Sequence, residues 1–158
     1  MKNKNNRVKF PKTSETIVTE VVCPNDTNPM GFLQGGKLVQ WMDIASAVCA
    51  QNHAEHICVT ASIDSVKFKT PAKVGDIITI KAKITRAFTS SMEIFVQAWA
   101  KKVVSQKAYL INEAYFTFVA IDDNGNPASE IISIKPKTLD EKKQYEEAEI
   151  RKKLRAKK

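Results

Sequence analysis

Long apolar runs are absent from this sequence of 158 residues. No stretch approaches the ~20 consecutive apolar residues that a membrane-spanning helix needs. The first residues, MKNKNNRVKFPK, are basic, but no apolar segment follows them, so they lack the form of a secretory signal. We therefore expect a cytoplasmic chain without membrane insertion.

Metal ligands and nucleotide-binding loops are also scarce. The three cysteines, Cys23, Cys49 and Cys58, are an odd number without the spacing of a zinc site. This predicts unpaired thiols in a reducing compartment. The two histidines, His53 and His56, have no ligand set beside them, so we expect them at a helix end rather than at a metal ion. No glycine pattern of the P-loop or Rossmann type occurs.

Positive charge is concentrated at the two ends of the chain. Of the net charge of +8, residues 1–12 carry +5, residues 135–158 carry +5, and residues 13–134 carry −2. A nucleic-acid-binding domain groups its basic residues on a folded face, so a nearly neutral centre argues against that class. The basic ends are predicted to be solvated tails, with an anionic ligand or partner touched by a tail as the alternative.

The centre of the chain has the pattern of one buried helix and several strands. Residues 15–22 are β-branched and predict a strand. Residues 36–53 contain no proline and place Leu38, Met42, Ala45 and Cys49 at helical spacing. At least four strands with short turns follow, which makes them antiparallel neighbours, and a change of phase predicts a bulge near Asp64–Ser65. We expect an α+β fold in which an antiparallel sheet of five to six strands wraps around one long central helix.

The C-terminal segment, residues 136–158, predicts a charged helix or tail. Oppositely charged residues recur four apart, as in Glu147–Arg151 and Glu149–Lys153. The apolar stripe of this segment is thin, so we expect the helix to project from the domain or to fray.

Two glycines and an acid on the central helix form a candidate catalytic site. Gly35 and Gly36 leave the first amide groups of the helix uncovered, at the positive end of the helix dipole. Such amides can hold a carbonyl oxygen that becomes an oxyanion. Asp43 lies two helical turns beyond Gly36 on a face of small residues. A carboxylate with few local partners suits a general base; the alternative is an Asp43 that is half-exposed or satisfied by a backbone N–H.

The run DTNPMGFLQGGKLVQWMDIASAV, residues 26–48, resembles the signature of hotdog-fold acyl-CoA thioesterases of the acyl-CoA hydrolase type. In that family an Asn-x-x-Gly loop precedes a Gly-Gly helix start, and an acid follows seven residues after the second glycine. Asn28, Gly31, Gly35, Gly36 and Asp43 fall in this register. Further matches are Thr60, the segment VKFKTPAKVGD (residues 66–76), the run SSM (residues 90–92) and the strand ending FTFVAID (residues 116–122). The resemblance covers residues 13–128, which we expect to be one hotdog domain.

The resemblance implies hydrolysis of an acyl-CoA thioester to a carboxylic acid and coenzyme A, which is part of the substrate and not a cofactor. Asp43 is then a general base on water or a nucleophile. Asn28 orients the water or the substrate, and the amides of Gly35 and Gly36 polarise the thioester carbonyl. Such domains work as homodimers in which Asn28 and Asp43 of one site come from different subunits, and the dimers commonly assemble into trimers of dimers.

The resemblance also implies a set of substrate-binding residues: Thr60, Phe68, Arg86, Ser90 and Ser91. Arg86, with Lys67 and Lys69, is a candidate for the coenzyme A phosphates, although each is equally a candidate for a solvated strand residue. The chain has Phe88 where the family often has glycine and Ser90 where it often has threonine.

Two other functions are available to the same fold. A non-catalytic acyl-CoA-binding sensor has no need of a desolvated acid beside the thioester, so Asn28 with Asp43 favours the enzyme. A hotdog dehydratase needs a histidine paired with the helix acid, and neither His53 nor His56 is placed for it.

Overall fold

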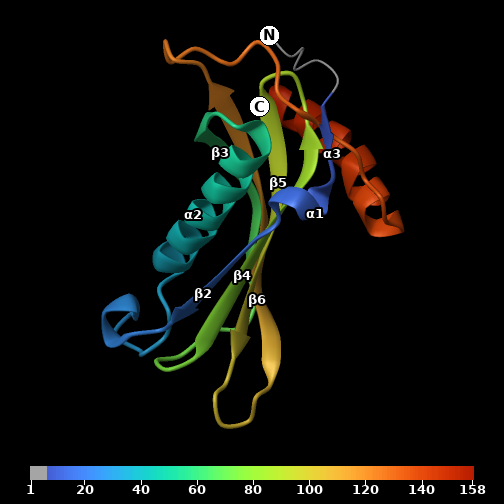
Figure 1. Ribbon diagram of the computed structural model, residues 1–158. Coiled ribbons are helices and arrows are strands. Elements are labelled where there is room, and N and C mark those ends of the chain that lie inside the picture. The colour runs from blue at the N-terminus through green and yellow to red at the C-terminus, as the bar shows by residue number, and fades with distance from the viewer. Residues whose placement is uncertain (1–6) are drawn as a thin grey trace.

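The computed structural model describes residues 7–158 as a curved sheet with a long helix on each side (Figure 1). Its helices are α1 (Pro11–Ser14), α2 (Gly35–Ala54) and α3 (Leu139–Ala156), with a 3-10 turn at Pro24–Asp26. Its strands are β1 (Val8–Lys9), β2 (Thr16–Val21), β3 (Ile57–Phe68), β4 (Ile77–Ala87), β5 (Ser91–Lys101), β6 (Ala108–Ile121) and β7 (Ser133–Ile134).

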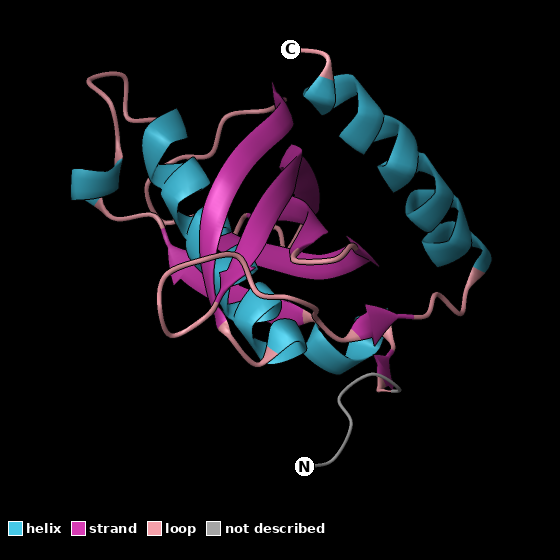
Figure 2. Cartoon of the chain, turned by 90° about the horizontal axis from the view of Figure 1, so that it is seen from above, coloured by secondary structure: helices cyan, strands magenta, loops and turns pink. Residues whose placement is uncertain are grey.

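Five antiparallel strands form the main sheet in the order β2-β4-β5-β6-β3. The sheet curls around α2, which lies in its concave face (Figure 2). Alternate residues of β4, β5 and β6 point into this face and form the core, including Ile80, Val96 and Phe116. This confirms the expected hotdog architecture of a five-stranded sheet around one central helix.

Helix α2 is buried on one side only. Leu38, Met42, Ala45 and Cys49, the residues at helical spacing, all face the sheet and are buried. On the opposite side Ile44 is 52% exposed and Val48 is 40% exposed, so the chain leaves an apolar stripe of its central helix uncovered.

Strand β3 ends the sheet, and no strand within residues 7–158 pairs with its outer edge. Its register with β6 shifts between Asp64 and Lys67, where Ser65 has a φ of 57°. The bulge predicted near Asp64–Ser65 is therefore present. Ile57, Val59 and Ile63 are exposed along this edge strand.

The N-terminal residues 7–14 pack against the domain rather than forming a free tail. The Lys9 ammonium donates to the carbonyl oxygens of Asn52 (2.8 Å) and His53 (2.9 Å) at the end of α2, where a cation is favoured by the helix dipole. Arg7 forms two hydrogen bonds with Glu55, at 2.8 and 2.6 Å. The remainder of the predicted basic segment, residues 1–6, lies outside the described residues.

Helix α3 packs on the convex face of the sheet, so the expectation that it projects or frays was wrong (Figure 2). Arg151 donates two hydrogen bonds, at 2.9 and 2.8 Å, to Glu93 of β5, whose side chain is fully buried. Arg155 lies 3.3 Å from carboxylate oxygens of both Glu93 and Asp64. Charged pairs therefore dock a helix whose apolar stripe is too thin to do so.

The charge pairing within α3 is partly as predicted. Arg151 lies 3.6 Å from Glu147, whereas Glu149 pairs with Arg86 of β4 at 3.3 Å. Thr138 begins the helix with a capping box, in which its side chain accepts from the Glu141 amide at 3.1 Å. Among the helices of residues 7–158, none combines the length and apolar character needed to span a membrane.

Candidate active site

The loop before α2 is shaped by the side chain of Asn28. Its Oδ1 accepts hydrogen bonds from the amides of Met30 (3.0 Å) and Phe32 (3.2 Å). Its backbone carbonyl accepts from the amide of Gly31 (2.9 Å), whose φ of +80° favours glycine. Because Oδ1 is committed to the loop, the group of Asn28 that is left to contact a ligand is its Nδ2 amide.

The two glycines at the start of α2 have different roles. A Cβ at Gly35 would lie 3.0 Å from the Phe68 ring, so a larger residue there would have to displace that ring. A Cβ at Gly36 would meet no atom within 4 Å. The first helical hydrogen bond is donated by Leu38 to Gln34 (3.1 Å), so the amides of Gly35 and Gly36 precede it, as the predicted oxyanion site requires.

Asp43 is held by Thr60. The Thr60 hydroxyl donates to Asp43 Oδ1 at 2.7 Å across the gap between α2 and β3. The carboxylate thus has few partners, as expected, and Asp43 is half-buried, as in the alternative of a half-exposed acid. A hydroxyl donor fixes the orientation of the carboxylate, and an oriented carboxylate is what a base or a nucleophile needs.

Asp43 and the helix start of the same chain are well separated. The seven residues from Gly36 to Asp43 correspond to about 10 Å of rise along the axis. That distance is too great for both groups to contact one carbonyl group. Each chain thus presents two half-sites, Asn28 with the helix start and Asp43 with Thr60.

A small apolar pocket of about 140 Å³ lies beside the helix start. Its walls include Gly35, Leu38, Phe68 and Ile111, with Lys69 among them as a cation. Phe68, a predicted substrate-binding residue, is 58% exposed there. Sequence reasoning did not find Leu38 or Ile111 as site residues, because Ile111 enters the pocket only through a bulge opposite Ala98 that no residue pattern announces.

The predicted substrate-binding residues Ser90, Ser91 and Arg86 do not line the pocket beside the start of α2. Ser91 of β5 pairs with Val119 of β6, which pairs in turn with Val59 of β3, the residue before Thr60. At the usual strand spacing this puts Ser91 roughly 10 Å from Val59. Arg86 is held by α3: its guanidinium donates to the carbonyl of Tyr145 (3.1 Å) and lies over the Tyr145 ring at 4.2 Å. The structure thus brings Thr60 to Asp43 and Phe68 to Gly35. Ser90 lies in the turn before β5, Ser91 begins β5, and Arg86 lies under α3.

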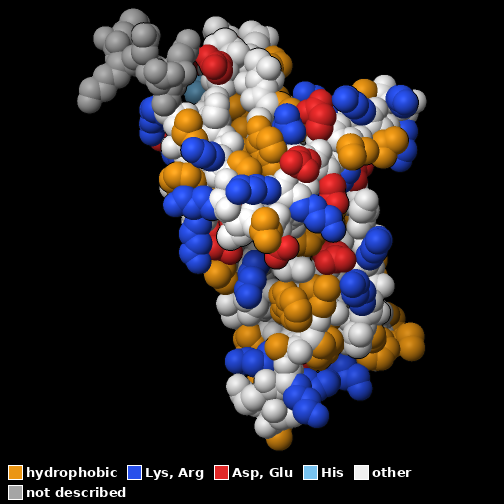
Figure 3. All heavy atoms as spheres, turned by 90° about the vertical axis from the view of Figure 1, so that its right-hand side faces the viewer, with side chains coloured by type: hydrophobic (Ala, Val, Ile, Leu, Met, Phe, Trp, Pro, Cys, Tyr) orange, Lys and Arg blue, Asp and Glu red, His pale blue; other side chains and the backbone are white. Residues whose placement is uncertain are grey.

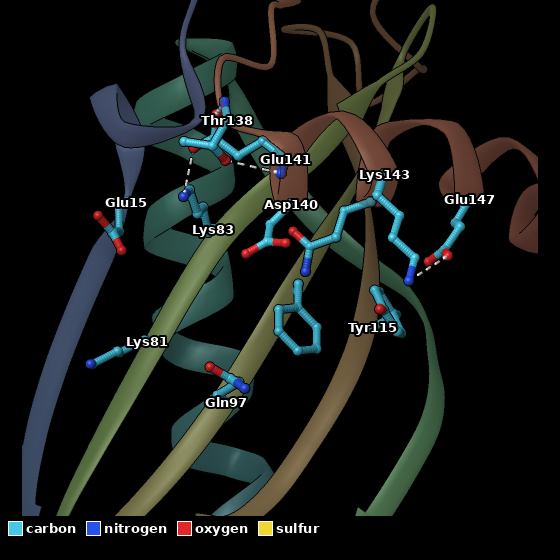
Figure 4. Close-up of a pocket in the computed structure, with 12 residues that line it drawn as sticks. Glu15, Lys81, Lys83, Gln97, Tyr115, Thr138, Asp140, Glu141, Lys143 and Glu147 are labelled. Carbon is cyan, nitrogen blue, oxygen red and sulfur yellow. Dashed lines mark hydrogen bonds and ion pairs between the residues drawn. The ribbon is translucent and has the colours of Figure 1, made fainter.

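A larger, mixed-charge pocket of about 540 Å³ separates α3 from the sheet (Figure 4). Lys83 of β4 pairs across it with Glu141 of α3 at 2.7 Å, and Lys143 pairs with Glu147 along α3 at 3.9 Å. Burial alone would raise the pKa of Glu141, but hydrogen bonds from Lys83 and from the amides of Lys137 and Thr138 hold it at about 2. The pocket lies on the opposite face of the sheet from Asp43.

Three other residues carry side chains that could do chemistry: Cys49, His53 and His56. Burial raises the pKa of the Cys49 thiol to about 12, so it is not a nucleophile at neutral pH. Burial also lowers the pKa of His53, whose Nε2 lies 2.7 Å from the Ile132 carbonyl. His56 Nδ1 lies 2.8 Å from the carbonyl of Ala54, the last residue of α2, in agreement with its predicted place at the helix end.

Comparison with known proteins agrees with this arrangement. Residues 30–105 match the model of the thioesterase superfamily. The chain is 35% identical over 133 residues to the uncharacterized acyl-CoA thioester hydrolase YkhA of Bacillus subtilis, covering 84% of this chain and 77% of that protein. A hexameric acyl-CoA thioesterase of known structure superimposes with a TM-score of 0.91 at 37% identity, over 96% of both chains. The chain therefore belongs to the hotdog-fold acyl-CoA thioesterases.

Two further relatives bear on the site and on chain length. The Asp43Ala variant of the acyl-CoA hydrolase of Staphylococcus aureus matches with a TM-score of 0.88 at 36% identity, over 96% of this chain and 92% of that one. Structures of that hydrolase also exist as Asn28Ala and Thr60Ala variants and with butyryl coenzyme A. Mouse acyl-coenzyme A thioesterase 11 is 38% identical over 111 residues, 70% of this chain but only 19% of that protein.

Proposed function

We propose that the protein hydrolyses acyl-CoA thioesters to a carboxylic acid and coenzyme A. The observation that carries the proposal is the Asp43–Thr60 hydrogen bond of 2.7 Å, which presents an oriented carboxylate on the uncovered side of α2. The S. aureus hydrolase has been studied as variants of its own Asp43, Asn28 and Thr60. This supports the proposal that an aspartate, an asparagine and a threonine form the site of the present chain.

In the proposed reaction, Asp43 removes a proton from water as the water oxygen attacks the thioester carbon. The carbonyl oxygen becomes negative and is stabilised by the amides of Gly35 and Gly36 at the positive end of α2. The carbon–sulfur bond then breaks, and the proton held by Asp43 is returned to the coenzyme A sulfur. Direct attack by the Asp43 carboxylate, followed by hydrolysis of the anhydride, is the alternative course.

We further propose that two chains complete each site. The half-sites of one chain are about 10 Å apart along α2, and the surfaces beside Asp43 that the chain leaves uncovered are apolar: Ile44 and Val48 of α2, with Val59 of β3. A second chain placed against them buries these residues and brings its Asn28 loop to Asp43. The hexameric relative supports a trimer of such dimers, and the cytoplasmic location stays a prediction.

The test is release of free thiol from a panel of acyl-CoAs of different chain length, followed with a thiol-reactive dye. We expect release by the wild type and a loss of about 1000-fold or more for Asp43→Ala, since the proton acceptor is gone. Asp43→Asn is the matched variant, because it keeps the Thr60 contact and the shape of the side chain.

Two results contradict the proposal. Wild-type activity in a folded Asp43→Ala protein would remove Asp43 from the mechanism. Tight binding of acyl-CoA without thiol release from any chain length would identify the sensor function instead.

A further inference from the structure

Two loops at one end of the molecule form a single surface. They are residues 69–76 between β3 and β4 and residues 102–107 between β5 and β6, and both lie at the lower end of the sheet in Figure 1. Asp76 joins them, because its carboxylate accepts from the Tyr109 hydroxyl (3.3 Å) and lies 4.0 Å from the Lys102 ammonium. A hollow of about 430 Å³ lies between the loops. We call this surface the tip platform: Lys73, Val74, Lys102, Val103 and Val104.

Valines project from the tip platform into solvent. Val74 is 48% exposed, Val103 is 52% exposed and Val104 is completely exposed. Single exposed apolar side chains are ordinary on protein surfaces, but here three of them line one hollow. Removing them from water is favourable, so the tip platform offers binding energy that the fold itself does not use.

Positive charge surrounds these valines. Besides Lys69, which pairs with Glu113 at 3.5 Å, the two loops and the adjoining strand end carry Lys73, Lys101, Lys102 and Lys107. Their acid is Asp76, which is 7% exposed and already occupied by the hydrogen bond from Tyr109 and by the Lys73 amide at 3.0 Å. In Figure 3 basic side chains gather around the lower end of the molecule, hydrophobic atoms reach its lowest point, and no acidic side chain is visible in the lower third of that face.

We propose that the tip platform docks on an anionic lipid surface. The three valines enter the boundary between headgroups and acyl chains, and the four lysines lie at the level of the lipid phosphates. A second copy of the chain is a poorer occupant, because a symmetric contact of this surface with itself would bring the same lysines together. The docking is peripheral and reversible, requires no membrane-spanning segment, and goes beyond the proposed hydrolysis.

Co-sedimentation of the full chain with vesicles tests the proposal. We expect the protein to sediment with vesicles of equal parts phosphatidylcholine and phosphatidylglycerol, to remain in the supernatant with pure phosphatidylcholine, and to be released by salt. Each of Lys73→Gln and Lys107→Gln should weaken the partition coefficient about fivefold. The double variant Val103→Ser, Val104→Ser should weaken it about tenfold or more, because its apolar contribution is lost.

The matched control is the double variant Ile150→Ser, Leu154→Ser, which removes two similarly exposed apolar side chains from α3 and should bind vesicles like the wild type. Equal sedimentation of both double variants would overturn the proposal, as would failure of the wild type to sediment with the anionic vesicles. Size-exclusion chromatography of the valine variant tests the other possible occupant, a second copy of the chain. If the variant forms a smaller assembly than the wild type, the tip platform is a contact between copies and lipid docking is overturned.

Discussion

Thr60 and Asp43 show what sequence reasoning reaches at the scale of single residues. Both were predicted as site residues, Asp43 from its place on the helix and Thr60 from the resemblance. Their 2.7 Å hydrogen bond was not, because it depends on the register of β3, which shifts between Thr60 and Ser62 and again after Asp64. A side chain's partner across the sheet therefore stays hidden until both bulges are placed.

The Thr60 hydroxyl is predicted to act by positioning Asp43. Thr60→Val removes the donor and keeps the side-chain volume, and hydrogen bonds to charged groups contribute about 1.5–3 kcal/mol. We therefore expect kcat for acyl-CoA hydrolysis to fall about 10- to 100-fold while KM changes little. Thr60→Ser restores the hydroxyl and should restore kcat. A Thr60→Val enzyme with unchanged kcat, or a serine variant as slow as the valine one, would assign Thr60 to packing alone.

The two glycines at the start of α2 look alike in the sequence but have different surroundings in the structure. A Cβ at Gly35 would lie 3.0 Å from the Phe68 ring, whereas space is open beside Gly36. The pattern predicted the pair as an oxyanion site but gave no reason to distinguish them, because the reason lies on a strand more than thirty residues away. Close approach of backbone to a neighbouring element is a tertiary property.

At the scale of elements, periodicity located α2 to within one residue at each end. It also located the strands of the main sheet in their order along the chain. It misjudged α3, because helix docking was inferred from apolar residues alone. Arg151 and Arg155 read as solvated charges in the sequence, yet they neutralise the fully buried Glu93. The alternation of β5 places Glu93 on the face away from the apolar residues Met92 and Ile94, so its burial beneath α3 was not predicted.

Removing Arg151 is predicted to destabilise the fold strongly. Arg151→Ala leaves the Glu93 carboxylate buried with less compensation, which costs about 3–5 kcal/mol of unfolding free energy. Denaturant unfolding measures this loss. Lys143→Ala, which breaks an exposed pair of 3.9 Å with Glu147 on the same helix, should change stability by less than about 1 kcal/mol.

The double variant Glu93→Met, Arg151→Met separates the buried charge from the packing of α3. Replacing both partners by apolar side chains of similar length should recover most of the loss. If Arg151→Ala were no more harmful than Lys143→Ala, the buried pair would not be what holds α3.

At the scale of the whole molecule, the half-sites predict complementation between inactive chains. Asn28→Ala and Asp43→Ala should each be inactive alone. After exchange of subunits, half of the dimers are mixed and each has one intact site of two, so about a quarter of the wild-type activity should return. Mixed dimers detected by native mass spectrometry without any recovery would show that each site lies within one chain.

The uncovered edge of β3 has a consequence for the newly made chain. An unpaired strand edge lined by exposed apolar residues such as Ile57, Val59 and Ile63 is also a template for aggregation. If a second copy covers this edge, as in the proposed dimer, the folded monomer is the vulnerable species until that copy binds, and slow synthesis or dilution prolongs its exposure. The proposed assembly would then protect the chain from aggregation as well as complete its sites.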